Sequence, residues 1–168
     1  MKRKQFILKT ILGAGSIINA PVLGFAKKSP SLIDPLPSEK VREFVIAGHT
    51  DLDKVKNMLG EMPGLLFATW DWGGGDFETA LEGAGHMGNK EIANVLISKG
   101  ARTNLFALTM LGKTELVKGY LEIYPEYLTA KGPHGLTLLH HANKGGEQAK
   151  ELSYYLQSKG LTETFMKL

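Results

Sequence analysis

The sequence predicts an all-α solenoid of about four helix-turn-helix repeats with short hairpin loops. Four similar helix-loop signals recur along the chain, and an amphipathic helical segment follows each of them. In the middle two segments, apolar residues recur at i, i+1, i+4 and i+5, which places one apolar stripe on each helix. No single repeat can bury such a stripe alone, so the repeats are expected to stack on one another.

The repeats are unevenly spaced. Their equivalent positions are Thr50, Gly88, Gly112 and Gly146. The intervals between these positions are 38, 24 and 34 residues. The short interval is explained by a missing hairpin, because residues 101–104 run directly into the next helical segment. The long interval contains an enlarged connection at residues 67–76.

Two segments are similar to the ankyrin signature Thr-Pro-Leu-His-x-Ala: TALEGA (residues 79–84) and TLLHHA (residues 137–142). In addition, KGARTN (residues 99–104) resembles the Gly-Ala-Asp-x-Asn ending of an ankyrin repeat. Over residues 39–160 the chain therefore resembles the ankyrin-repeat family, and more narrowly a bacterial subgroup of small exported members without an assigned activity. The intervals scatter about the ankyrin period of about 33 residues.

The two signature copies depart from the family pattern at their helix starts. Ala80 and Leu138 replace the proline, and Glu82 replaces the histidine of the first copy. These changes are expected to weaken the hydrogen bonding that the family uses there, without altering the spacing. His140 matches the signature histidine, and the resemblance implies that it bonds to neighbouring backbone.

The chain is expected to divide into four parts. A Pro-rich linker, residues 27–38, follows the leader, and Ser38 is suited to cap a first helix that begins at Glu39. The repeat domain covers residues 39–160. The C-terminal tail, residues 161–168, is amphipathic and is expected to cap the last repeat, with its large apolar residues Phe165 and Leu168 covering the final interface.

Residues 1–26 have the architecture of a secretory signal peptide. A positive segment precedes a moderately apolar stretch, and Gly24 and Ala26 are small residues that suit a signal peptidase. The basic start also resembles a twin-arginine signal, except that Lys4 stands at the second arginine, so the export route stays open. Retention as a membrane anchor is the alternative, but Lys9 and Pro21 interrupt a span that would need about 20 apolar residues.

The mature protein is therefore expected in the periplasm or cell envelope, without a stable membrane span and as a monomer by itself. Four of the 20 basic side chains lie in residues 1–26, so the remaining 16 face 17 acidic ones. Nucleic acid is not expected as a partner, because phosphate binding needs a surplus of lysine and arginine. The absence of cysteine excludes disulfides, thiol nucleophiles and cysteine-ligated zinc.

The resemblance implies a non-catalytic module that binds a partner protein through hairpin tips and inner-helix surfaces. Both tryptophans lie two residues apart in the enlarged connection, and exposed tryptophan is enriched at binding hot spots. The predicted contact patch consists of Trp70, Asp71, Trp72, Asp76, Phe77 and His86. The alternative is that tryptophan packs beneath the loop, with the three glycines serving only its turns.

No catalytic residue, cofactor or metal site is predicted. His134, His140 and His141 lie close together in the sequence. Adjacent histidines, however, point about 100° apart on a helix, whereas metal-binding pairs are spaced i, i+3 or i, i+4. His49 and His86 are expected to be structural residues at inter-helix turns.

A small enzyme, or an accessory subunit of an envelope enzyme, is the main alternative function, and a structural envelope module is a third. The enzyme hypothesis joins His134 to Asp71 or Asp76 in the WDWGGGD loop. The repeat order separates them by about two repeat stackings of roughly 10 Å each, so a shared site is not expected. Asp71, Asp76 and Glu78 also lack an evident partner for acid-base chemistry.

Overall fold

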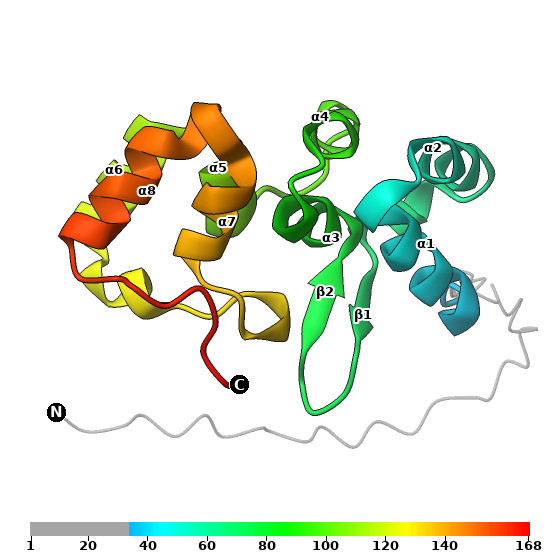
Figure 1. Ribbon diagram of the computed structural model, residues 1–168. Helices are drawn as coiled ribbons and strands as arrows, with labels where there is room; N and C mark the ends of the chain where they lie inside the picture. Colours follow the sequence, from blue (N-terminus) through cyan, green and yellow to red (C-terminus); the bar gives the residue numbers. More distant parts are fainter. Residues whose placement is uncertain (1–33) are drawn as a thin grey trace, which may run out of the picture. The chain divides into compact units, whose positions relative to one another are not determined.

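The computed structural model describes residues 34–168, which fold into a mostly helical unit with one small hairpin (Figure 1). The predicted leader and the first part of the linker lie outside the described residues. Successive helices form pairs: α1 (Ser38–Thr50) with α2 (Leu52–Glu61), α3 (Ala80–Met87) with α4 (Lys90–Ser98), α5 (Leu105–Met110) with α6 (Thr114–Ile123), and α7 (Leu138–Gly145) with α8 (Lys150–Ser158). None of the helices after residue 33 combines the length and apolar character needed to cross a bilayer.

The first helices of the pairs, α1, α3, α5 and α7, lie in a row in which each packs against the next. A glycine allows the closest approach, since a Cβ on Gly48 of α1 would lie 2.6 Å from the Cα of Ala80 at the start of α3. Helices α2 and α4 lie on the side of this row away from the hairpin (Figure 1). Buried apolar side chains form one cluster from α1 to α5 and a second from α6 to α8.

The enlarged connection forms an antiparallel hairpin of β1 (Thr69–Asp71) and β2 (Phe77–Thr79). Residues 73–75 at its tip are glycines with φ values of 122°, 68° and 90°, a region that other residues rarely adopt. The Oδ1 atom of Asp71 accepts hydrogen bonds from the backbone N–H groups of Gly73 and Gly75. The three glycines therefore build the turn, as one of the two sequence interpretations proposed.

Glu82 strengthens the start of α3. Its carboxylate accepts hydrogen bonds from the backbone N and Oγ1 of Thr79, while its own N–H donates to Thr79 Oγ1, which completes a capping box. The expected weakening at this position is therefore wrong, because glutamate replaces the signature histidine with a different set of bonds. Helix α1 begins at Ser38, one residue earlier than predicted, and Ser38 does not cap it.

No strand lies between α4 and α5 in the described chain, which agrees with the missing hairpin that the short repeat interval predicted. Asn104 caps α5 directly, since its side chain accepts a hydrogen bond from the N–H of Ala107. A longer segment without an α-helix or a named strand connects α6 to α7. That segment contains the short 3-10 turn η3 (Pro133–Gly135).

The C-terminal tail covers the last repeat with different residues from those expected. Phe165 and Leu168 are 57% and 58% exposed, so the prediction that they cover the interface is wrong. Leu161 is buried instead, and Met166 packs against the second apolar cluster. Extended chain alternates its side chains between two faces, and the tail turns Met166 rather than Phe165 inward.

Candidate metal centre

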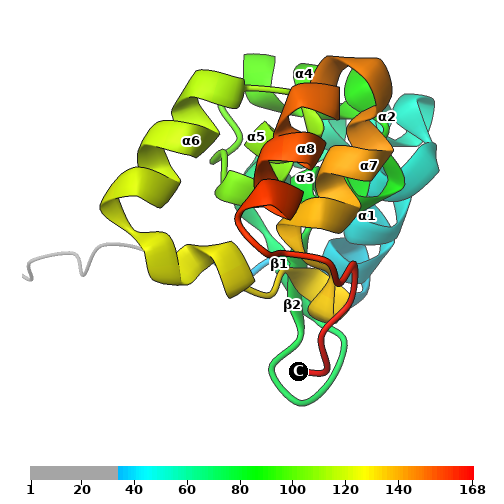
Figure 2. The ribbon, with the colours of Figure 1, turned by 60° about the vertical axis from the view of Figure 1, so that its left-hand side comes forward.

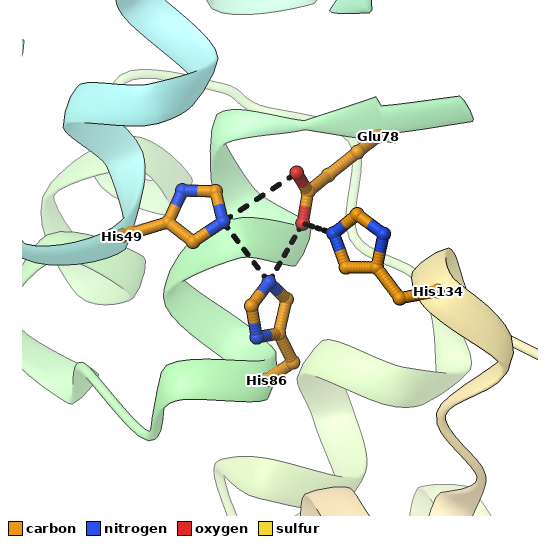
Figure 3. A group of neighbouring side chains, drawn as sticks. All are labelled: His49, Glu78, His86 and His134. Carbon is orange, nitrogen blue, oxygen red and sulfur yellow. Dashed lines mark hydrogen bonds and ion pairs between the residues drawn. The ribbon is translucent and has the colours of Figure 1, made fainter. Parts of the chain in front are cut away.

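Three histidines and one glutamate meet beside the hairpin (Figure 3). His49, Glu78, His86 and His134 each offer one ligand atom, and these four atoms lie within 4.8 Å of one another. His49 and His86 lie in the last turns of α1 and α3, Glu78 lies in β2, and His134 lies in η3. The group therefore joins four segments that are far apart in the sequence.

The spacing of the donor atoms suits a small metal ion. His86 Nε2 lies 2.8 Å from Glu78 Oε1 and 3.1 Å from His49 Nε2. His49 Nε2 lies 3.5 Å from Glu78 Oε2, and His134 Nε2 lies 3.6 Å from Glu78 Oε1. Tetrahedral zinc with bonds of about 2.0–2.1 Å separates its donor atoms by about 3.3 Å. The separations in the cluster lie on both sides of this value, so ion binding would require the four side chains to adjust.

Hydrogen bonds on the far side of two rings orient their lone pairs toward the cluster. His49 Nδ1 lies 2.9 Å from the carbonyl oxygen of Val45, and His134 Nδ1 lies 2.7 Å from Asp76 Oδ2. Both partners are acceptors, so Nδ1 carries the hydrogen in each neutral ring and Nε2 presents a lone pair. Lone pairs and a carboxylate that converge on one point are satisfied by a cation.

A further hydrogen bond orients the carboxylate. The indole N–H of Trp72 donates to Glu78 Oε2 at 2.7 Å. Oε2 is therefore already partnered, and Oε1 faces the imidazoles of His86 and His134. This arrangement favours a single Glu78 oxygen as the metal ligand.

The electrostatic environment also favours a cation. Glu78 is 0% exposed. Burial by itself raises the pKa of the Glu78 carboxyl, but the hydrogen bonds that it accepts from His86 and Trp72 and its attraction to the imidazoles of His49 and His86 outweigh burial and lower this pKa below its usual value. Glu78 is therefore an anion, and the negative ends of the α1 and α3 dipoles point toward the same place.

The structure divides the residues of the predicted contact patch between two faces of the hairpin. His86 is a member of the cluster, while Trp72 and Asp76 bond to its members. Trp70 is half-buried, lies on the same face as Glu78 and contacts Trp72 edge to face. Asp71 and Phe77 are exposed on the other face of the hairpin. Half of the patch thus belongs to the candidate metal centre.

The expected separation between the loop and His134 is wrong. Asp76 Oδ1 accepts a hydrogen bond from the backbone N–H of His134 at 2.8 Å, and Asp76 Oδ2 bonds to its ring. The expectation assumed that equivalent loops are spaced by the stacking of all intervening repeats. The segment before α7 instead lies beside the hairpin before α3, so that η3 reaches Asp76 directly.

His140 and His141 lie outside the cluster. His140 Nε2 donates to the backbone carbonyl of His86 at 2.9 Å, which is the kind of bond that the ankyrin resemblance implied. It holds the end of α3 that carries a candidate ligand. His141 is fully buried, and its Nδ1 donates to the carbonyl oxygen of Thr137.

Sequence reasoning missed His49 and Glu78 as parts of one site. A usable signal was present, because the Ala-Gly-His segments at residues 47–49 and 84–86 occupy equivalent repeat positions. Equivalent positions of stacked repeats lie side by side, so the two histidines were predictable neighbours. Strand alternation also places Glu78 on the same face of the hairpin as Trp70.

Comparisons with models of protein families, with curated proteins and with solved structures gave no match for this chain.

Proposed function

We propose that this protein binds one divalent transition-metal ion, preferably Zn²⁺, at His49, Glu78, His86 and His134. The observation that carries the proposal is the convergence of three imidazoles and one buried carboxylate from four separate segments within 4.8 Å. Hydrogen-bond partners behind the ligands support the site, because Val45, Asp76 and Trp72 orient three of the four ligands.

The donor set favours zinc over other common ions. Imidazole nitrogen suits zinc, copper and nickel, whereas magnesium and calcium prefer shells made of oxygen. Three imidazoles and one carboxylate whose ligand atoms lie within 4.8 Å of one another form a ligand set that zinc sites use. Copper and nickel bind similar nitrogen donors and are the competitors to include in a binding experiment.

The test is a direct count of bound metal. Full-length protein is stripped with a chelator, equilibrated with Zn²⁺ at pH 7.5, dialysed and analysed by elemental mass spectrometry and titration calorimetry. We expect one equivalent of zinc per chain. Less than about a tenth of an equivalent would contradict the proposal, since a site with four protein ligands retains zinc through dialysis. In that case protons shared among the histidines would explain the cluster.

We further infer that the four helix pairs are ankyrin-type repeats and that the chain is exported to the cell envelope. The row of inner helices, the hairpin before α3 and the threonine caps at Thr79 and Thr137 support the first inference. The leader sequence supports the second. In an oxidising compartment a site without cysteine keeps its ligands, because imidazole and carboxylate are not readily oxidised.

Binding of a partner protein is a second candidate function, which one observation favours. Phe77 is 58% exposed on the face of the hairpin opposite Glu78, so a partner can contact it without disturbing the metal site. An exposed aromatic side chain on a rigid hairpin is a typical anchor at protein interfaces. The module would then present the hairpin in a fixed position, with little loss of entropy on binding.

Affinity purification from envelope extract tests this second function. We expect a specific partner to be recovered with the wild-type chain and lost with Phe77→Ser. Met87→Ser is the matched control, because Met87 is similarly exposed but lies at the end of α3. Recovery of the same partner by both variants would move the interface away from Phe77.

A further inference from the structure

His134 occupies an unusual place among the four candidate ligands. His49 and His86 lie on helices and Glu78 on a paired strand, whereas His134 lies in the three-residue turn η3. Among residues 34–168, it is the one residue other than glycine with a positive φ, at 60°. Side chains rarely adopt this left-handed conformation, and it persists only where the surrounding structure enforces it.

Asp76 holds His134 from the side of the hairpin. One carboxylate oxygen accepts from the backbone N–H at 2.8 Å, and the other accepts from Nδ1 at 2.7 Å. These bonds fix both the backbone and the ring orientation, but they come from one side only.

The C-terminal tail holds the other side of the same turn (Figure 2). The N–H of Met166 donates to the carbonyl oxygen of Gly135 at 2.8 Å, and the N–H of Thr137 donates to the carbonyl oxygen of Thr164 at 3.1 Å. Lys131 Nζ donates to the carbonyl oxygen of Lys167 at 2.9 Å. The tail therefore bonds to the chain both before and after His134.

The contact between tail and turn is close enough to require glycine. Gly135 has a φ of 73°, and a Cβ at this position would collide with the backbone oxygen of Met166. The tail is also anchored to the protein body, because Leu161 is buried and Met166 packs on the second apolar cluster. The tail thus forms a fixed support for the turn.

We infer that the C-terminal tail, residues 161–168, positions His134 as a metal ligand and thereby sets the affinity and coordination geometry of the site. This inference rests on the proposed metal binding. Without the tail, Asp76 alone would hold the turn from outside, so the backbone of His134 could relax toward a negative φ and its imidazole would leave the other three ligands for part of the time. During that time an ion would keep three protein ligands and gain water.

A single backbone donor tests this positioning role. Met166→Pro removes the N–H that donates to Gly135, and Met166→Ala is the matched control that loses the same packing but keeps the N–H. We expect Met166→Pro to weaken Co²⁺ and Zn²⁺ binding about 10- to 100-fold relative to Met166→Ala, which is the range typical for losing a contact that orients a ligand. The Co²⁺ absorption bands should lose the intensity typical of four-coordinate cobalt, and a shortened chain lacking residues 163–168 should behave in the same way.

A measurement without metal separates the two proposals. In the metal-free protein, the His134 N–H that bonds to Asp76 should exchange with solvent at least about ten times faster in Met166→Pro than in Met166→Ala, if the tail holds the turn. Equal exchange rates, or equal Co²⁺ affinity and spectra, would overturn the positioning role. If the wild-type chain binds no metal but this exchange rate rises, the proposed metal function fails and the tail is a purely structural support.

Discussion

Replacing His86 with alanine should lower the affinity for Zn²⁺ by more than about 100-fold. Losing a residue that only orients a ligand lowers metal affinity by about 10- to 100-fold, and losing the ligand itself has a larger effect. His86 Nε2 is central to the site, at 2.8 Å from Glu78 Oε1 and 3.1 Å from His49 Nε2. Competition titration against a chromophoric chelator measures the change. Met87→Ala, at the adjacent exposed position, should leave the affinity unchanged.

A second variant separates the loss of a ligand from damage to the fold. Glu78→Gln keeps the shape of the side chain and an acceptor for the Trp72 N–H, but it removes the buried negative charge. We expect this variant to keep its helical circular dichroism and to lose most of its zinc affinity. Zinc binding at wild-type strength in both His86→Ala and Glu78→Gln would show that the ion is held elsewhere in the chain.

The second large effect concerns acid stability and His141. Burial lowers the pKa of this histidine from 6.5 to about 4, opposed by its bond to Thr137 and aided by the charges of His140 and His86. At pH values between these two pKa values, the unfolded chain binds a proton at His141 that the folded chain does not bind. The free energy of unfolding therefore falls as the pH falls. The total loss from this one residue is about 3 kcal/mol, at about 1.4 kcal/mol for each unit of pKa shift.

Urea unfolding at several pH values between 7.5 and 4.5, with chelator present, measures this loss. His141→Leu removes the titrating group, so its stability should depend less steeply on pH, although it is less stable at neutral pH because the bond to Thr137 is lost. The slopes are compared, since the four other histidines are present in both proteins. Parallel curves for wild type and variant would assign the acid sensitivity to other groups.

Local sequence was sufficient for much of the fold. The mostly helical class, the helix pairs, the missing third hairpin and the glycine turn at residues 73–75 followed from apolar periodicity, spacing and the freedom of glycine. Each of these features depends on residues close together in the chain. The first residue of α1 and the hydrogen bonds of Glu82 at the start of α3 differed from expectation. The sequence alone does not distinguish between nearby residues that can form these hydrogen bonds.

The candidate metal centre depends on contacts between distant segments. Position in the repeat relates His49 to His86, and strand alternation relates Glu78 to the rest of its hairpin, but neither pattern contains His134. The approach of η3 to the hairpin is held by the two bonds between Asp76 and His134 and by the tail that bonds to the turn from outside. These are consequences of packing over the whole unit.

The sequence by itself therefore determined the helix pairs, the hairpin turn and the charge balance of the chain, since short-range periodicity and composition carry that information. Only the tertiary structure decided that Asp76 bonds to His134, that Trp72 orients Glu78, and that Met166 rather than Phe165 packs against the protein. The physical reason is that the geometry of the ligands depends on distances between segments. The packing of the helices, the connections between them and the strained turn at His134 determine these distances together.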